Sequence, residues 1–143
     1  MNVKIKKISE NAIMPEYASA GSAGADLYNA SGDVTIDAGE SVAIGTGIAM
    51  QIPEGYVGLV YARSGLACKS GLAPANKVGV IDSDYRGEIK VVLYNHSKEA
   101  RMVASGERIA QIVIAPFIRC EFEEGEIDST QRGEGGFGST GKK

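Results

Sequence analysis

The apolar residues of this chain fall in short runs and alternations, a pattern that predicts β-strands. Clusters of turn-forming residues, such as 37–40, 53–55 and 84–87, separate these runs. Strands are predicted over residues 3–8, 33–36, 41–46, 48–52, 55–62, 88–94, 101–103, 108–114 and 117–122. This pattern predicts an all-β fold, a barrel or distorted sandwich of many short strands.

One helix is predicted, a short one over residues 64–69 with Ser64 as its N-cap. From Gly125 onward the apolar periodicity stops and the chain becomes polar and glycine-rich. We therefore divide the chain into a β-barrel domain, 1–124, and a C-terminal arm, 125–143. Composition alone favours a flexible, disordered tail for the arm. A single aromatic residue, Phe137, stands among glycines and hydroxyl residues, an arrangement that a solubilising tail does not need.

The bulk composition adds limits to this picture. The chain has 143 residues, about one domain, with 43% hydrophobic and 23% charged residues, as in ordinary globular proteins. Its net charge of -3 argues against a nucleic-acid-binding surface. No apolar run approaches the ~18 residues of a membrane span, and no targeting segment is evident, so we expect no membrane partner and a cytoplasmic location. The two cysteines, Cys68 and Cys120, form no metal-binding pattern; a disulfide between them is possible, but they favour a reducing compartment.

Two phosphate-loop patterns nearly match the arm, and both fail. Gly133, Gly135 and Gly138 have the G-x-G-x-x-G spacing, but that fingerprint works only between a strand and a helix, and no helix follows. The P-loop pattern ending in G-K-[ST] fails because Lys143 stands where the hydroxyl residue should be. The only histidine, His96, lies in a predicted turn and is expected at the surface, which argues against a Ser-His-Asp hydrolase.

Four further segments stand out, at 23–28, 62–67, 76–87 and 106–112. Each has an ordinary structural explanation when taken alone. Asp26 fits a turn or an edge strand, and Ser64 fits a helix cap. Asp82 and Asp84 fit turn formers, and Gln111 fits a solvent-facing position in a strand.

Taken together, these segments point to one family. The motifs RSGLA, GVIDSDYRG, GERIAQ and RGEGGFGSTG, in this order, closely resemble the trimeric dUTPase family, and the resemblance runs from Val3 to Gly141. It implies a distorted, jelly-roll-like barrel (a β-clip) and a homotrimer whose active sites lie at subunit interfaces. The arm of one chain is expected to close over a site built by two others. The implied reaction is Mg²⁺-dependent hydrolysis of dUTP to dUMP and pyrophosphate. It removes dUTP from the DNA precursor pool and supplies dUMP for thymidylate synthesis.

The resemblance also implies roles for individual residues. Asp82 is expected to activate the water that attacks the α-phosphorus, and a carboxylate general base suits this chemistry. Tyr85 is expected to pack on the deoxyribose and to exclude a 2′-hydroxyl. Asp26 is expected to contact Mg²⁺ through water, since Mg²⁺ bound to phosphates keeps several waters.

Further residues are implied to bind the nucleotide. A hairpin of residues 76–81 and the strand through Lys90 is expected to read uracil mainly through main-chain groups, at Asn76, Gly79, Val80, Ile81 and Lys90. The phosphates are expected to contact Arg63, Ser64, Gly65 and Gln111, with Ser64 at a helix start. In the arm, Arg132 is expected near the γ-phosphate and Phe137 on the uracil ring. Gly138, Ser139 and Thr140 are expected to donate to the phosphates. An arm that orders on substrate would act as a lid.

Two other functions are compatible with this scaffold. One is dCTP deamination on a similar fold, against which the intact RGEGGFGSTG motif argues. The other is a regulatory or interaction module without enzymatic activity. That alternative is disfavoured because both Asp82 and Phe137 are present.

Overall fold

The computed structural model of the chain describes residues 1–136, and these form twelve strands and one helix, confirming the all-β prediction. The strands are β1 Lys4–Lys7, β2 Glu16–Tyr17, β3 Ala25–Tyr28, β4 Val34–Ile36, β5 Ser41–Gly45, β6 Ile48–Gln51, β7 Tyr56–Tyr61, β8 Leu72–Pro74, β9 Val78–Ile81, β10 Lys90–Asn95, β11 Arg101–Val103 and β12 Arg108–Pro116. The helix is α1, Ser64–Ser70.

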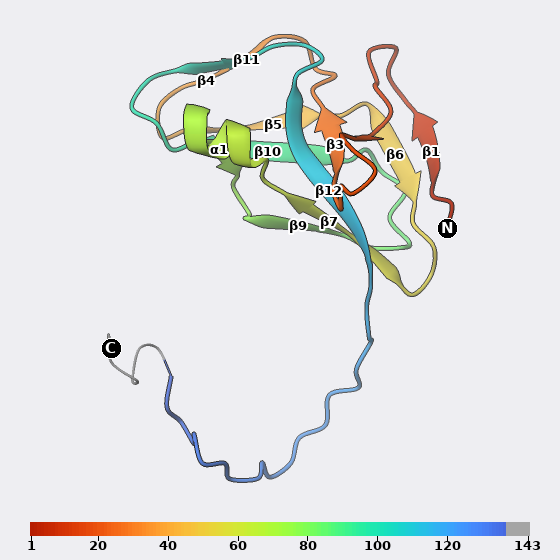
Figure 1. Cartoon of the computed structure of the whole chain (residues 1–143), viewed down its shortest axis with the longest axis vertical. Coiled ribbons are helices and arrows are strands. Elements are labelled where there is room, and N and C mark those ends of the chain that lie inside the picture. The colour runs from red at the N-terminus through yellow and green to blue at the C-terminus, as the bar shows by residue number, and fades with distance from the viewer. Residues whose placement is uncertain (137–143) are drawn as a thin grey trace.

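The strands form antiparallel sheets that enclose one core. The largest sheet has the order β2-β3-β12-β7-β9, and a second has the order β5-β10-β8. Two smaller pairs, β1-β6 and β4-β11, complete the wall. In Figure 1, β5 and β10 run across the direction of β7 and β12, as expected of a jelly-roll-like barrel. The most deeply buried core side chains are aliphatic: Leu27, Ile36, Ile44, Ile48, Leu72, Ile89, Leu93, Val103 and Ile109.

The sequence of β10 shows why these segments become strands. Val91, Leu93 and Asn95 are buried, whereas Lys90 and Val92 are exposed, so alternate residues face the core. Asn95 is a polar residue on the buried face, and its amide donates to the carbonyls of Ile36 and Glu99. The buried amide therefore has its hydrogen bonds satisfied.

Helix α1 lies where the sequence predicts it, but its N-cap differs from the prediction. The N-cap residue is Arg63, which has an extended backbone and makes no side-chain cap hydrogen bond; Ser64 is the first helical residue. The helix ends at Gly71, which has φ of 70° and donates its N–H to Ala67. Glycine adopts this left-handed conformation without the steric cost of a side chain. Ser64 is exposed.

Two sequence-based expectations about strands are wrong. Residues 117–122 form no strand, since Ile118 and Phe122 are 88% and 99% exposed and no other strand lies beside them in the part of the chain that is described. The expected hairpin between 76–81 and the strand through Lys90 is also not formed. Strand β9 pairs with β7, whereas β10 pairs with β5 and β8, so the two segments belong to different sheets.

The sequence pattern did not predict β2, β3, β8 or β9; the segment of β9 was expected only through the family resemblance. Strand β2 has only two residues, and β8 ends in a proline at a sheet edge. Strand β3 contains Asp26, a residue type that is rare in strands, and this carboxylate is nevertheless buried.

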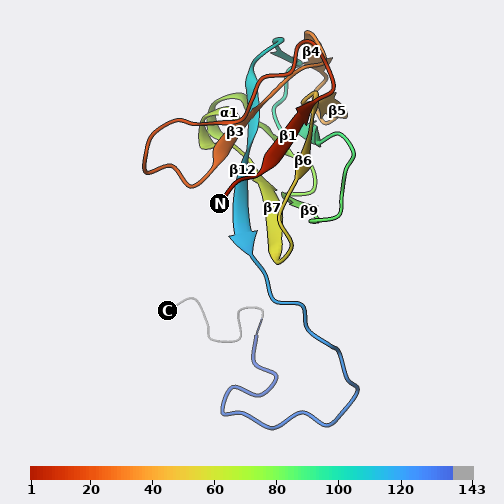
Figure 2. The same cartoon turned by 90° about the vertical axis from the view of Figure 1, so that its right-hand side faces the viewer.

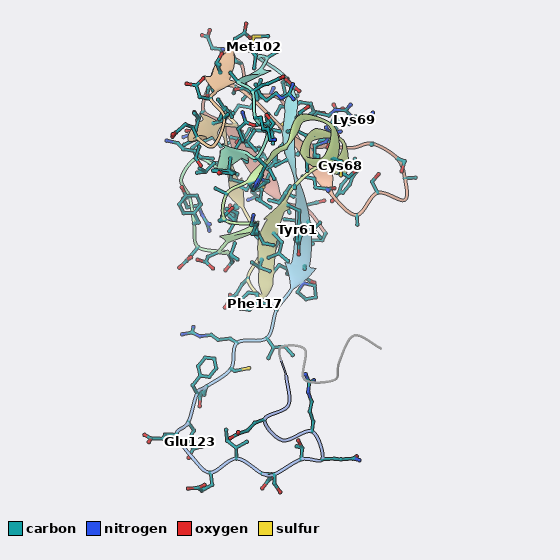
Figure 3. The ribbon with its side chains drawn as sticks, turned by 90° about the vertical axis from the view of Figure 1, so that its left-hand side faces the viewer. Tyr61, Cys68, Lys69, Met102, Phe117 and Glu123 are labelled. Carbon is teal, nitrogen blue, oxygen red and sulfur yellow. The ribbon has the colours of Figure 1, made fainter. Side chains whose placement is uncertain are left out.

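After Pro116 the chain leaves the barrel and runs without helix or strand through Gly136 (Figures 1 and 2). Figure 3 shows Phe117 at the point of departure and Glu123 well outside the barrel. The two cysteines are free and exposed, and His96 is exposed as predicted. Within residues 1–136, no helix has the length and hydropathy that crossing a membrane would require.

Candidate active site

A cleft of about 360 Å³ lies beside the β3, β7 and β12 strands and the start of α1. We call it the Asp26 cleft. Five residues predicted from the sequence line it: Asp26, Arg63, Ser64, Gly65 and Gln111. They come from three separate segments of the chain, which the pairing of β12 with β3 and β7 brings together. The cleft therefore combines a guanidinium, a hydroxyl and an amide, groups that suit an anion with several oxygens.

The carboxylate of Asp26 binds two arginines. Arg63 Nε donates to Oδ1 at 2.7 Å, and Arg108 Nη1 donates to Oδ2 at 3.2 Å. Asp26 is only 8% exposed, and a buried carboxylate is stable when its charge is paired and hydrogen-bonded. The pair of arginines explains how β3 can hold an aspartate at a buried position.

The sequence analysis did not identify Arg108, and the reason is a β-bulge. Strict alternation would place residues 108 and 111 on opposite faces of a strand. The register against β3 shifts between Arg108 and Ala110, so that Arg108 lies opposite Tyr28 and Gln111 lies opposite Asp26. The bulge thereby turns Arg108 toward the same carboxylate that faces Gln111. The GERIAQ motif identified this region as part of a candidate site, but its residues do not indicate the β-bulge.

Tyr28 lies on the same strand as Asp26, next to the ion pairs. Burial raises the pKa of the Tyr28 hydroxyl above its usual 10.0, and the carboxylates of Glu16 and Asp26 raise it further. The two arginines oppose this shift. Tyr28 therefore stays neutral at physiological pH and adds no charge to the cleft.

Gln111 holds the edge of the Asp26 cleft in place. Its Nε2 donates to the carbonyl of Ala62 at 2.9 Å, and its backbone lies opposite Tyr61 of β7. The bond ties β12 to the turn that leads into Arg63 and Ser64. A glutamine amide has two N–H donors, so one remains for other contacts.

A second hollow, of about 220 Å³, lies between the end of β9 and the start of β10. We call it the Tyr85 pocket, and its walls are Val80, Ile81, Asp82, Tyr85, Glu88, Ile89 and Lys90. Asp82 directly follows β9, and the turn that it begins is closed by the Tyr85 N–H donating to the Asp82 carbonyl at 3.2 Å. The pocket joins an aromatic ring, two carboxylates and an ammonium group.

The side chain of Tyr85 is fixed from two sides. Its hydroxyl donates to the carbonyl of Glu88 at 3.0 Å. Its ring covers the α-carbon of Gly87, where a β-carbon would come within 2.6 Å of Cζ. The carboxylate of Glu88 accepts from Gly47 N–H at 3.0 Å and lies 3.7 Å from the Lys90 ammonium. The pocket wall is therefore braced against the β5–β6 turn.

Asp82 also borders an open groove on its other side. The groove is formed with Ser83, Asp84 and Arg86 and with Phe117 and Arg119 at the root of the C-terminal segment. The Asp26 cleft and the Tyr85 pocket have no lining residue in common. The two hollows lie at different points along β7. Tyr61 lines the Asp26 cleft, whereas Gly58, three residues before Tyr61, pairs with Ile81 of the Tyr85 pocket.

Other predicted residues lie outside both hollows. Asn76 is exposed just before β9, and its amide lies near the α-carbon of Gly79. Arg132 is exposed in a turn, and its Nε donates to the Gly135 carbonyl at 2.7 Å. Phe137, Gly138, Ser139 and Thr140 lie outside the described residues.

A divalent metal has few protein ligands to bind here. Within residues 1–136, no three or more His, Cys, Asp or Glu side chains come together as a metal site. Asp26 is the one carboxylate among the described residues that line its cleft, and both its oxygens already accept from arginines. A carboxylate oxygen accepts more than one hydrogen bond, so this donor set fits contact with a hydrated cation through water and does not fit direct ligation.

Comparison with known proteins gives one consistent result. A sequence model of the family described as dUTPase matches residues 10–141. The deoxyuridine 5′-triphosphate nucleotidohydrolase of Nautilia profundicola is 52% identical over 99% of this chain and 100% of its own length. The enzyme of the same name from a Hydrogenobaculum species is 48% identical over the full length of both chains.

Solved structures agree with the sequence comparison. A mutant dUTPase of Staphylococcus bacteriophage 80alpha with dUpNHpp superposes with a TM-score of 0.89 and 31% identity, over 98% of each chain. A mutant dUTPase from phage phi11 of S. aureus, described with a structural Mg(II) ion, has a TM-score of 0.81 and 28% identity over 89% of this chain and 98% of its own. The jelly-roll-like fold predicted from the sequence is thus confirmed.

Proposed function

Because the chain belongs to the dUTPase family, we propose that it hydrolyses dUTP to dUMP and pyrophosphate by water attack on the α-phosphorus, with Asp82 as general base and Mg²⁺ as cofactor. That it is an enzyme acting on dUTP follows from the family and from full-length relatives of the same activity. The base, the metal, the attacked atom and the assembly are the proposal. One observation carries it: Asp82 is exposed at the mouth of a pocket that also holds Tyr85.

Asp82 supplies the base in this mechanism. Its carboxylate takes a proton from water as the water oxygen bonds to the α-phosphorus. The bond from that phosphorus to the oxygen that bridges it to the β-phosphorus breaks, and pyrophosphate leaves with the bond's electron pair. A positioned general base contributes typically ~10²–10⁴-fold to such a step. The reaction needs no covalent intermediate, since water is the nucleophile.

The Tyr85 pocket selects the nucleoside. The ring of Tyr85 packs on the deoxyribose, so that a 2′-hydroxyl would clash with it. Strand β9 ends its sheet, and the N–H and C=O groups on its outer side face no other strand of the described chain. These free main-chain groups, which belong to alternate residues of the strand, suit the edge of a uracil base along Gly79, Val80 and Ile81, with Asn76 and Lys90 beside them. Hydrogen-bonding sites of this kind discriminate strongly between bases.

The Asp26 cleft binds the triphosphate. Arg63 offers a guanidinium, and Ser64 and Gly65 offer a hydroxyl and first-turn amide groups that lack helical partners. Gln111 offers its remaining N–H. Asp26 holds Arg63 and would contact a bound Mg²⁺ through water. Bound Mg²⁺ would neutralise triphosphate charge.

The active enzyme is a homotrimer whose sites combine different chains. The two hollows of one chain share no residue, yet one nucleotide must contact both its phosphate and its nucleoside groups. On the outer face of the large sheet, Val113 lines the Asp26 cleft, Val80 lines the Tyr85 pocket and Leu59 lies in register between them, and Val80 is 61% exposed. Burial of this apolar face against a second copy would bring the Asp26 cleft of one chain to the Tyr85 pocket of another.

The arm, residues 125–143, completes the site as a lid. Arg132 is exposed and its side-chain contact in the described chain is to the nearby Gly135, so it is available to a phosphate. Phe137 stacks on uracil, and Gly138 and Ser139 donate to the phosphates. Closure excludes bulk water from the reaction. The cellular role is removal of dUTP from the DNA precursor pool and supply of dUMP.

The test is pyrophosphate release from dUTP, UTP, dTTP and dCTP measured side by side, with Mg²⁺ and with a chelator. We expect rapid release from dUTP alone, lost with the chelator and restored by added Mg²⁺. Ammonia release from dCTP would replace this assignment with deamination. Full activity in the chelator would remove Mg²⁺ from the mechanism while leaving the hydrolysis of dUTP in place.

A further inference from the structure

We infer that Gly24 is a positioning residue, whose bare α-carbon provides the space in which the side chain of Gln111 lies. The inference rests on the proposed function, in which Gln111 faces the triphosphate. It adds a residue that acts on the substrate only through Gln111. Gly24 lines the Asp26 cleft at the start of β3.

The contacts at Gly24 come from one side chain. A β-carbon at this position would lie 3.0 Å from Cδ and 3.2 Å from Cβ of Gln111, and closer still to Oε1. These are its three nearest neighbours. A turn of the terminal amide moves Oε1 but leaves Cδ in place, so it would not relieve the contact with Cδ; the contact with Cβ, which is fixed by the backbone of β12, requires a further shift of a few tenths of an ångström. The whole side chain would have to leave its present rotamer.

The backbone of Gly24 gives no other reason for glycine. Its φ lies outside the left-handed region, unlike that of Gly71, which ends helix α1. An alanine would therefore adopt this φ without strain, and what excludes the alanine methyl group is the side chain of Gln111.

Displacing Gln111 would have two consequences at the cleft. Its Nε2 would lose the carbonyl of Ala62, the residue before Arg63 and Ser64. The second N–H of the same amide would no longer be oriented toward the site proposed for the triphosphate. The phosphate-facing side of the cleft would lose a donor and the hydrogen bond that braces its turn.

The experiment is a double-mutant cycle of Gly24→Ala and Gln111→Ala, with kcat and KM for dUTP measured for each variant. Each single substitution is expected to lower kcat/KM by about 10- to 100-fold, the range for one hydrogen bond to a charged group. Because the truncated side chain leaves the space next to residue 24 nearly free, the double variant is expected to resemble Gln111→Ala. The matched control is Gly21→Ala, in the same loop, where an added β-carbon meets nothing within 4 Å.

The outcomes separate a positioning role from general damage. The inference would be overturned if the fold-losses in kcat/KM of the two single variants multiply in the double variant. It would also be overturned if Gly24→Ala keeps the wild-type kcat/KM. If Gly24→Ala does not fold, Gln111→Ala in the same chain is expected to restore folding, since it removes the two closest atoms, Oε1 and Cδ; failure to restore it would also overturn the inference. A wild-type chain that does not hydrolyse dUTP would instead refute the proposed function, so the two failures are distinguishable.

Discussion

Arg63 Nε lies 2.7 Å from Oδ1 of Asp26, so the arginine that is proposed to bind phosphate is oriented by a buried carboxylate of its own chain. Asp26→Asn keeps the shape of this contact but removes the negative charge between Arg63 and Arg108. We expect the free energy of unfolding to fall by about 1–2 kcal/mol. This is the lower part of the range for hydrogen bonds between charged groups, because Arg108 is half exposed and solvent screens its contact with Asp26. Urea denaturation at neutral pH measures this loss.

The same variant tests the orientation of Arg63. Because the guanidinium is no longer held, kcat/KM for dUTP is expected to fall together with stability. Asp37→Asn makes the same chemical change at an exposed carboxylate and is the control. If both variants are equally stable, the ion pairs at Asp26 do not contribute to the fold.

Asp82→Asn is expected to lower kcat by about 10²–10⁴-fold, because the amide cannot accept the proton of the attacking water. Binding of dUpNHpp is expected to stay close to wild type, since the substitution preserves the shape of the side chain. Isothermal titration and pyrophosphate release measure the two effects separately. Asp84→Asn, two residues later on the same exposed loop, is the control and is expected to keep its activity. Full turnover by Asp82→Asn would exclude Asp82 as the base.

The sequence pattern predicted the core of this fold well. Regular alternation, as in β10, produces strands with one buried face, and the pattern identified most of the barrel in this way. It failed for β3 because Asp26 is tolerated there only through Arg63 and Arg108, and both lie far away in the chain. It also predicted a strand at 117–122, where apolar residues alternate but no partner strand follows in the described chain.

The candidate site shows a similar division. Motif order was enough to predict Asp26, Arg63 and Gln111, which the structure brings into one cleft. Arg108 was not predicted, because a bulge that changes which face a residue occupies leaves no mark in residue spacing. The separation of the Asp26 cleft from the Tyr85 pocket is likewise a property of three-dimensional register, which residue spacing does not report.

Gly87→Ala is expected to weaken discrimination between dUTP and UTP. The added methyl group would lie within 2.6 Å of Cζ of Tyr85, so the ring must move. If Tyr85 excludes the 2′-hydroxyl, its displacement lowers kcat/KM for dUTP more than for UTP. The ratio of the two kcat/KM values is the measurement, and Gly21→Ala, where the methyl group meets no neighbour, is the control for glycine replacement. An unchanged ratio would show that the position of the Tyr85 ring does not set sugar selectivity.

Deletion of the residues after Gly125 is expected to leave the barrel folded but nearly inactive. Residues 117–136 form no helix or strand, and Ile127 is 94% exposed, so little packing is lost. The thermal midpoint should therefore stay close to that of the full chain, while kcat/KM is expected to fall because the proposed lid is gone. Deletion of Lys142 and Lys143 alone is the control and is expected to keep activity. A truncated chain with an unchanged rate would assign the arm no part in catalysis.

Mixing two inactive variants tests whether one site uses two chains. Asp82→Asn has an intact Asp26 cleft, and Arg63→Ala has an intact Tyr85 pocket, so neither is expected to turn over dUTP alone. If each site pairs the cleft of one chain with the pocket of another, co-refolding in equal amounts leaves about one site in four with both parts intact. We expect the separate variants to have a kcat near zero. After they are unfolded and refolded together, we expect roughly a quarter of the wild-type kcat. Mixing without refolding is the control, because it leaves each proposed trimer uniform. No recovery after refolding, in mixed trimers identified by native mass spectrometry, would mean that each chain builds its site alone.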